Sequence, residues 1–340
     1  MRFPALRFLA LAAALALAGC TTGGSPVASP SATSVAESSV ASPGIGPYAG
    51  AVATIPIADG PRGVAWAGGS IWVASTLGGV VQRVDPDANE VIAEIDVGDR
   101  PVTLVTVGDD LWVSVLNGDA PSDDELVQID MDADAAGRRV TVPVHHNIAA
   151  GGGLIWVQDL DGELRAVDPE TAMVTDVVAT GFGPVALAAS EDAAYGIRSG
   201  GGVWRWPIGQ GELFEAELDI LVPGRSRVAA SGDGVWVAVP GRVLALDPAS
   251  LEVLAELSLT ELSLVNDLYV TESGVWLSAN VFSDELNLAG GSVLRLDPAT
   301  LEIRQTWSLG PESSGVVVAE ESVWAVDQSE HILARFPLTP

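Results

Sequence analysis

The feature that most constrains the fold of this chain is an aromatic residue that recurs at a spacing of about forty positions. Each copy lies in a short β-branched or alternating segment, which is typical of a β-strand. The seven copies are Trp72, Trp112, Trp156, Tyr195, Trp236, Trp276 and Trp324. Their successive separations are 40, 44, 39, 41, 40 and 48 residues. A period of this length with four strands per unit indicates the blades of a β-propeller.

Each unit divides into four short strands. Strand A precedes the aromatic residue, strand B contains it, strand C ends in an Asp-Pro pair and strand D follows that pair. The pair occurs four times and favours a turn, because the aspartate caps the turn and proline fixes the next φ angle. The aspartates of these pairs are Asp85, Asp168, Asp247 and Asp297. We therefore predict an all-β fold, a seven-bladed β-propeller with four-stranded antiparallel blades, over residues 48–340.

The last unit is one strand short. Its strands A, B and C are predicted near residues 315–319, 322–326 and 331–336, and the sequence then ends. Residues 51–57 have strand character but belong to no unit of their own. We expect this N-terminal segment to complete the last blade as its outer strand, which closes the ring and removes open sheet edges.

The first twenty residues have the pattern of an export signal. Arg2 and Arg7 give a positive start, and residues 8–18 form an apolar run too short to span a membrane. The run ends in Leu-Ala-Gly-Cys at residues 17–20, which resembles the lipobox of bacterial lipoproteins. The resemblance implies that residues 1–19 are a signal peptide and that acylated Cys20 anchors the protein in a lipid bilayer. An ordinary signal peptide is the alternative.

Cys20 is the only cysteine, so no intramolecular disulfide can form. It begins residues 20–47, a segment rich in Ser, Ala and Pro with almost no charge. Such a segment buries too little apolar surface to offset its ordering entropy, so we expect it to be a disordered tether. As a coil it would span roughly 30 Å and hold the propeller away from the membrane.

The charge of the chain limits its partners. The formal net charge is −29, and all sixteen basic residues are arginines. A nucleic-acid partner is not expected, because phosphate binding needs a concentrated positive surface. Adsorption to anionic lipid headgroups is disfavoured for the same reason.

Residues 72–75 (Trp-Val-Ala-Ser) with 83–86 (Arg-Val-Asp-Pro), and their copies at 236–238 and 246–248, resemble the bacterial repeat propellers of the YVTN and virginiamycin B lyase-like type. The resemblance covers residues 48–340 and implies a seven-bladed fold. Lyase members are known for histidine and glutamate side chains that bind Mg²⁺. This sequence has no histidine between His146 and His331, so we do not carry the lyase activity over to it.

Ligands of propellers usually lie at the end of the central channel formed by the D–A and B–C loops, which we term the channel face. Counting from the aromatic residues places a ring of polar side chains there. The predicted ligand-binding residues are Arg62, His146, Asn147, Asp159, Arg198, Arg227, Asn266, Asp267 and Asp327. The alternative is a set of solvated loop residues and inter-blade salt bridges, each of which contributes little.

A long B–C loop at residues 117–125 is the candidate metal site. It carries Asp119, Asp123, Asp124 and Glu125, and clustered carboxylates with backbone carbonyls can hold Ca²⁺ or Mg²⁺. The spacing does not match an EF-hand loop, so a solvated acidic loop is the alternative. The three histidines, His145, His146 and His331, fall on the channel face in blades three and seven, and we expect them to be exposed loop residues.

These observations predict a membrane-anchored, extracytoplasmic propeller lipoprotein. We expect a noncatalytic, monomeric module that binds a protein, peptide or envelope ligand at its channel face. The alternative is a divalent-metal-assisted enzyme, lyase- or lactonase-like, with its site at the mouth of the channel. No cofactor is identified by a motif, and Ca²⁺ or Mg²⁺ is the candidate ion.

Overall fold

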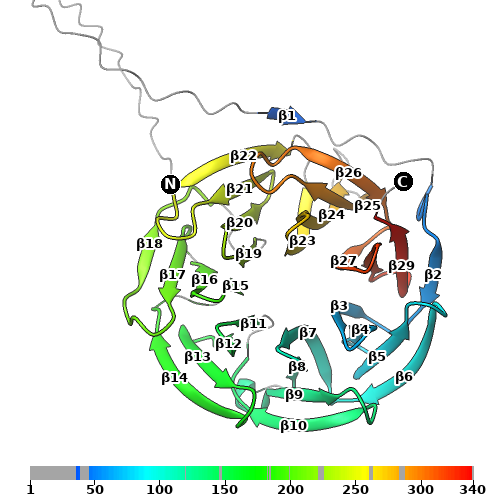
Figure 1. Ribbon diagram of the computed structural model, residues 1–340, viewed down its shortest axis with the longest axis horizontal. Coiled ribbons are helices and arrows are strands. Elements are labelled where there is room, and N and C mark those ends of the chain that lie inside the picture. Colours follow the sequence, from blue (N-terminus) through cyan, green and yellow to red (C-terminus); the bar gives the residue numbers. More distant parts are fainter. Residues whose placement is uncertain are drawn as a thin grey trace, which may run out of the picture. The chain divides into compact units, whose positions relative to one another are not determined.

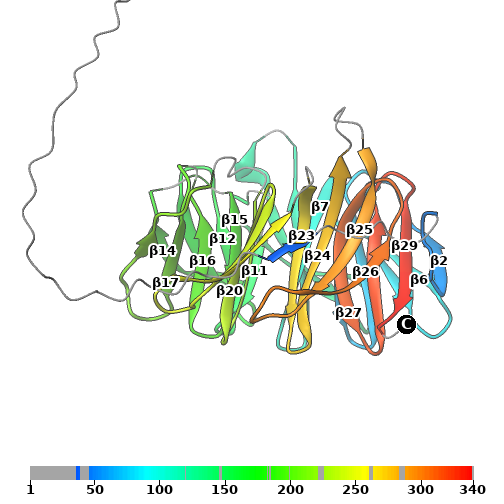
Figure 2. The same ribbon diagram turned by 90° about the horizontal axis from the view of Figure 1, so that it is seen from above.

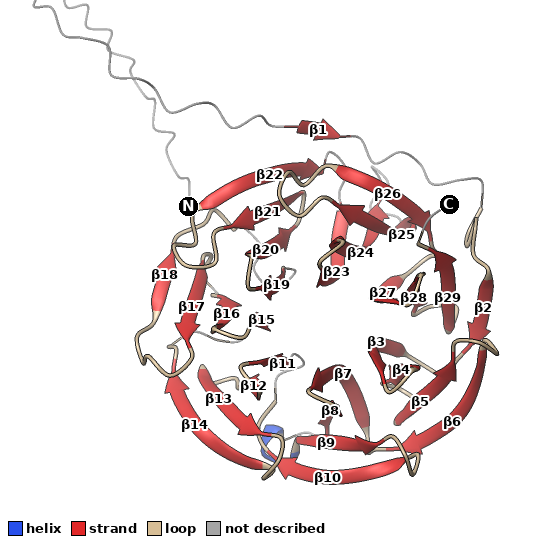
Figure 3. Ribbon diagram, in the orientation of Figure 1, coloured by secondary structure: helices blue, strands red, loops and turns tan. Residues whose placement is uncertain are grey.

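The computed structural model describes residues 36–38, 46–118, 120–144, 148–181, 183, 185–198, 200–220, 226–259, 263–282 and 288–338. Seven sheets surround a central channel, as predicted (Figure 1). Seen from the side, the inner strands run between the two faces of the ring (Figure 2). The described part holds one short 3-10 helix, η1 (Pro121–Asp123), which lies beside strand β9 (Figure 3).

The first four blades follow one another along the chain. Blade 1 consists of β3 (Pro61–Ala67), β4 (Ser70–Ser75), β5 (Val80–Asp85) and β6 (Glu90–Asp96). Blade 2 consists of β7 (Arg100–Val107), β8 (Asp110–Leu116), β9 (Glu125–Asp130) and β10 (Ala135–Thr141). Blade 3 consists of β11 (Ile148–Gly151), β12 (Leu154–Gln158), β13 (Glu163–Asp168) and β14 (Met173–Ala179). Blade 4 consists of β15 (Ala186–Ala189), β16 (Ala193–Ile197), β17 (Val203–Pro207) and β18 (Phe214–Ala216).

The last three blades complete the ring. Blade 5 consists of β19 (Arg227–Ser231), β20 (Gly234–Val239), β21 (Arg242–Leu246) and β22 (Val253–Leu259). Blade 6 consists of β23 (Ser263–Thr271), β24 (Gly274–Phe282), β25 (Leu288–Leu296) and β26 (Ile303–Ser308). Blade 7 consists of β27 (Ser313–Ala319), β28 (Ser322–Asp327), β29 (Ile332–Pro337) and β2 (Ala53–Pro56).

The N-terminal strand closes the ring, as the sequence predicts. Strand β2 pairs antiparallel with β29, with Ala53 opposite Arg335 and Pro56 opposite Ile332. Just before β2, the Tyr48 hydroxyl donates a hydrogen bond of 2.6 Å to the Asp327 carboxylate at the end of β28. Asp327 is fully buried. The first and last segments of the propeller are therefore joined by a strand pairing and by a partly buried side-chain hydrogen bond.

One short strand lies within the predicted tether. Ala36–Ser38 forms β1, which pairs parallel with Leu257–Leu259 on the outer edge of β22. The sequence predicted no regular structure here. An outer strand of a blade presents unpaired N–H and C=O groups, and these accept an additional strand from any extended segment within reach.

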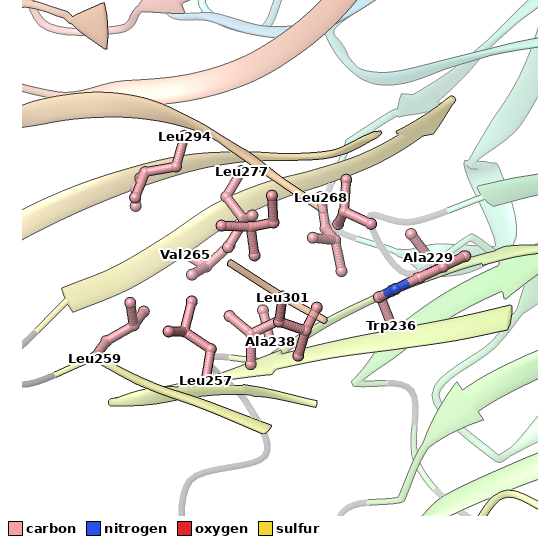
Figure 4. Close-up of a cluster of buried hydrophobic side chains, with 14 of the residues drawn as sticks. Ala229, Trp236, Ala238, Leu257, Leu259, Val265, Leu268, Leu277, Leu294 and Leu301 are labelled. Carbon is pink, nitrogen blue, oxygen red and sulfur yellow. The ribbon is translucent and has the colours of Figure 1, made fainter. Parts of the chain in front are cut away.

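The core is a series of clusters between neighbouring blades. All seven recurrent aromatic residues lie in the second strand of their blade and are buried. Between blades 5 and 6, Trp236 and Ala229 belong to one cluster with Leu268, Leu277 and Leu294 (Figure 4). Each blade therefore buries its faces against its neighbours, which is what a ring of sheets requires.

The Asp-Pro pairs form the predicted turns between the third and fourth strands. Asp85 accepts backbone hydrogen bonds from Asp87 and Ala88, and Asp168, Asp247 and Asp297 accept equivalent pairs. These backbone donors hold the pKa of Asp85 below its ordinary value, the bond from Ala88 having the largest effect. Asp130 makes the same turn in blade 2 without a proline. These aspartates shape turns.

The same turns join several of the blades to the blade before them. Arg83 of blade 1 donates to the carbonyl of Met131 in blade 2 at 3.0 Å. The Tyr195 hydroxyl of blade 4 donates to the carbonyl of Pro248 in blade 5, and the Trp236 indole of blade 5 donates to that of Pro298 in blade 6. Each acceptor is the residue that follows the turn aspartate. The blades are therefore connected in one direction around the ring.

Candidate functional site

The candidate site is a cavity of about 430 Å³ along the axis of the ring. The innermost strand of every blade contributes to its wall. Small and apolar residues, including Ala65, Leu104, Ala149, Ala188 and Ala229, also line the cavity, although their side chains are buried in the clusters between blades. Polar and charged side chains gather at the mouth of the channel face. More of the cavity surface is polar than apolar, so a ligand there would be held mainly by hydrogen bonds and charge.

β-Bulges carry several of these polar residues into the channel. The strand pairing shifts between Pro61 and Gly63, and Arg62 is the extra residue. It also shifts around Asn266, between Val265 and Asp267. Corresponding shifts occur in blades 2 and 7 around Thr103 and Ser314. A bulge redirects the side chain of its extra residue. The inner strands can therefore present these polar side chains to the axial cavity.

A chain of hydrogen bonds runs around one side of the mouth. Arg227 of blade 5 donates from Nε to the carbonyl of Asn266 at 2.7 Å. The Asn266 amide donates to the carbonyl of Ser313 in blade 7 at 2.8 Å, and the Ser314 hydroxyl donates to the carbonyl of Pro61 in blade 1 at 3.2 Å. These bonds fix the rim side chains through the backbone of the next blade, so they are held in place before a ligand arrives.

The charged groups at the mouth act on one another. The Asp267 carboxylate accepts backbone N–H bonds from Leu268 and Val316, both at 2.9 Å. Burial raises the pKa of Asp267, against the effect of these donors and of Arg227. Burial also lowers the pKa of Arg227, and the charge of Arg62 acts in the same direction. Arg62 is exposed to solvent and makes no ion pair within the described residues.

The structure brings together four of the predicted ligand-binding residues. Arg62, Arg227, Asn266 and Asp267 all line the axial cavity. His146 and Asn147 lie outside the described residues. Whether any of these residues binds a ligand remains a prediction.

Three predicted residues lie at the loops between second and third strands, as expected, but they are not among the residues that line the cavity. Asp159 accepts backbone bonds from Asp161 and Glu163 and pairs with Arg165, so it caps its own loop. Arg198 pairs with Glu215, which lies in the outer strand β18 of blade 4, and with Glu217, which directly follows that strand. Asp327 caps the loop after β28 and accepts the Tyr48 hydroxyl. Local turn capping and pairing with outer strands determine where these side chains lie.

The carboxylates of the acidic loop of blade 2 bond to groups within the loop or within the same blade. The Asp124 carboxylate accepts the backbone N–H of Asn117 at 3.0 Å, and burial raises the pKa of Asp124. Glu125 pairs with Arg139 at 2.8 Å, and Asp123 accepts the Ser122 hydroxyl at 3.2 Å. Among the described residues, no group of three or more His, Cys, Asp or Glu side chains is arranged to hold a metal ion. Asp119 and His145 lie outside those residues, and so does the predicted lipidation site Cys20.

Sequence reasoning missed part of the lining and the side-chain bond at the seam. Ser313 and Glu312 line the cavity, and Ser313 donates two hydrogen bonds of 2.8 Å to the Asn280 side chain. The Tyr48–Asp327 bond was also missed, because nothing in the local sequence of either residue indicates its partner. The bulges of blades 1 and 7 have one available signal, the glycines Gly63 and Gly315 beside them. A Cβ at Gly63 would collide with the carbonyl of Val102 in the next inner strand.

Comparisons with known proteins agree with the fold and add no family. No protein-family model matches the sequence, and no curated protein matches it. A chain in the solved structure titled "Crystal Structure of Mitotic Checkpoint Complex" matches with a TM-score of 0.67 and 10% sequence identity. The match covers 85% of this chain and 96% of that chain. Altogether 1493 chains of solved structures match, so this fold is common and does not by itself select a function.

The fold and the site together define a seven-bladed β-propeller whose channel mouth carries fixed charged and amide groups. The described residues include no helix that is both long and apolar enough to cross a membrane.

Proposed function

We propose that this protein is a bacterial lipoprotein of the extracytoplasmic envelope whose propeller binds a protein, peptide or envelope ligand at the channel mouth. The observation that carries the proposal is the convergence of Arg62, Arg227, Asn266 and Asp267 on one cavity. Two guanidinium groups, an amide and a carboxylate recognise hydrogen-bonding ligands with directional specificity.

The pre-set geometry of the mouth supports binding. Arg227 and Asn266 are fixed by bonds to backbone carbonyls, so little side-chain entropy is lost when a ligand engages them. Arg62, by contrast, is exposed and has no ion-pair partner among the described residues, so its donors are open to a ligand. The structural neighbour is, by its title, part of a protein complex, and protein binding is therefore within the range of this fold.

The anchoring part of the proposal depends on the sequence. Residues 17–20 carry the lipobox-like motif, and the following segment contains the Ser, Ala and Pro of a tether. Two or more acyl chains on Cys20 would anchor the protein stably. In a bacterium that processes lipoproteins, wild-type protein is expected in the membrane fraction, and Cys20→Ser in the soluble fraction. Equal membrane association of the two would contradict the anchoring.

The binding part is tested by site-specific photo-crosslinking in the same cells. A photoreactive residue at Gln328, which lines the cavity, is expected to give a discrete adduct. The matched control places the same residue at Asp109, an exposed position on the opposite face. The adduct should be lost when Arg62→Glu is added to the Gln328 probe. An adduct that is insensitive to Arg62→Glu, or that forms equally at Asp109, would contradict binding at the mouth.

A further inference from the structure

Three blades share a side-chain arrangement over their recurrent aromatic residue. In blades 1, 6 and 7 an arginine of the third strand lies directly opposite the tryptophan of the second strand. Arg83, Arg295 and Arg335 place their guanidinium carbons 5.3, 5.3 and 4.9 Å from the centres of the tryptophan rings. Each guanidinium also donates a hydrogen bond at the turn between the first and second strands of its blade. The acceptor is a serine hydroxyl in blades 1 and 7 and the Ser273 carbonyl in blade 6.

Blade 5 lacks this arginine. The residue opposite Trp236 is Ala245, which has no side chain long enough to reach the ring. A cavity of about 410 Å³ is found there, between blades 5 and 6. Its wall is mostly apolar and includes Trp236, Ala245 and Leu254. We call it the blade 5–6 pocket.

Blade 3 shows that an alanine alone does not make such a pocket. Ala166 lies opposite Trp156 in the same register. There, Trp206 and Ile208 of blade 4 pack against the cluster that contains Trp156 and Ala166. At the corresponding place beside blade 5, the turn between the third and fourth strands of blade 6 lines the pocket with Pro298 and Ala299. These smaller side chains leave the cavity beside Trp236 unfilled.

The rim of the blade 5–6 pocket is acidic. Asp233 and Glu272 line it, and both are exposed. None of the described residues that line it is basic. Asp233 and Glu272 belong to the turns between first and second strands, and Pro298 to a turn between third and fourth strands, so the pocket opens on the face opposite the channel mouth. It is therefore a separate site from the one proposed above.

We propose that the blade 5–6 pocket binds an arginine side chain presented by a partner polypeptide. The apolar wall accommodates the aliphatic stem, the Trp236 ring accepts the guanidinium face, and the carboxylates of Asp233 and Glu272 accept its N–H donors. Arg83, Arg295 and Arg335 show that this fold stacks a guanidinium on the equivalent ring. A planar guanidinium fits such a slot better than a compact ammonium ion.

The test uses N-acetyl-arginine amide as the probe and residue-specific NMR as the readout. The indole N–H signal of Trp236, assigned with Trp236→Phe, is followed as the probe is titrated into the millimolar range. Saturable movement of this signal is expected. The citrulline analogue, which has the same shape without the charge, should bind at least tenfold more weakly.

Two variants locate the binding. Ala245→Arg supplies the missing guanidinium from the chain itself and should reduce binding of the probe at least tenfold. Asp233→Asn with Glu272→Gln removes the rim charge at exposed positions, so the fold is unaffected, and should weaken binding severalfold. The matched control is Asp109→Asn with Glu191→Gln, which are exposed positions at the same registers in blades 2 and 4. Binding to the control should equal wild type.

Three results would each overturn the proposal. They are an unsaturable or absent response of Trp236, equal affinity for arginine and citrulline amides, and equal loss of binding in the rim and control double variants. Because the probe and the variants do not touch the channel mouth, failure here leaves the function proposed for the mouth unaffected.

Discussion

Replacing Tyr48 with phenylalanine removes one hydroxyl group from the seam of the ring and leaves the aromatic ring in place. That hydroxyl donates at 2.6 Å to Oδ2 of Asp327, which is fully buried. The other carboxylate oxygen accepts from Ser329 and Glu330. Tyr48→Phe therefore leaves Oδ2 of a buried charge without its side-chain donor.

The expected cost follows from the charge of the acceptor. A hydrogen bond to a charged group contributes about 1.5–3 kcal/mol to the free energy of unfolding. With an unfolding entropy of about 2.1 cal/mol/K per residue over about 290 residues, this loss lowers Tm by about 2–5 °C. Differential scanning calorimetry at neutral pH measures the change. Tyr195→Phe is the control, because its hydroxyl donates to a neutral carbonyl within the ring, and it should cost about 1 kcal/mol.

The same bond predicts a pH dependence. Burial, followed by the bond to Asp327, raises the pKa of Tyr48 far above its ordinary value. Since the folded pKa exceeds the unfolded one, the contribution to stability is complete below about pH 10 and declines as pH rises further. Above about pH 10, wild-type stability should fall more steeply than that of Tyr48→Phe, by up to about 1.4 kcal/mol per pH unit.

Two results would refute this reasoning. One is a cost for Tyr48→Phe below about 0.5 kcal/mol, the range of neutral surface substitutions. The other is an identical alkaline slope for wild type and variant, which would show that Tyr48 is not held in its protonated form by the fold.

Three further predictions concern the seam, the channel and the blade contacts. Gly310→Ala should destabilise the protein by about 1–3 kcal/mol in urea unfolding, because the new Cβ would collide with Asp327 and Tyr48, whereas Gly232→Ala enters open space and should be near neutral. Burial raises the pKa of Asp267, so its ionisation opposes folding above its unfolded pKa. As pH rises above about 4, the ordinary pKa of aspartate, the stability of Asp267→Asn should rise relative to wild type, and a constant difference would contradict this. Arg335→Met loses a stacked guanidinium bonded to Pro86 and Asn89 and should cost about 2 kcal/mol, while the exposed Arg304→Met should change stability by less than about 0.5 kcal/mol.

The fold could be predicted because its signals are local. Every recurrent aromatic residue, such as Trp72, marks the strand that contains it, and every Asp-Pro pair, such as that at Asp85, caps a turn within three residues. The closing strand was predictable for a different reason, since the last unit lacked one strand and residues 51–57 had no unit.

The candidate site was predictable only in part. Counting from the aromatic residues placed Arg227 and Asp267 at the channel mouth, because a two-residue turn joins the first and second strands in both of their blades. The same counting placed Arg198 in the loop after the second strand of blade 4, where it lies, but it could not show that its guanidinium pairs with Glu215 and Glu217, contacts that only the folded blade brings within reach. The blade 5–6 pocket could not be predicted either. The loop between the second and third strands varies in length, so only the strand register shows that Ala245 occupies the position of Arg83.

The position of β2 also determines the order in which the molecule can fold. This strand is synthesised before every other strand of the seven blades, yet its partner β29 is the last to be made. The first blades can form and pack on one another while the chain is growing, because their contacts are between neighbours in sequence. The seam cannot form until the last blade has been made, and bringing together segments about 280 residues apart carries the entropy of closing a long loop. Until then, the propeller is an open arc with uncovered faces at its two ends, and it becomes a ring when β2 pairs with β29.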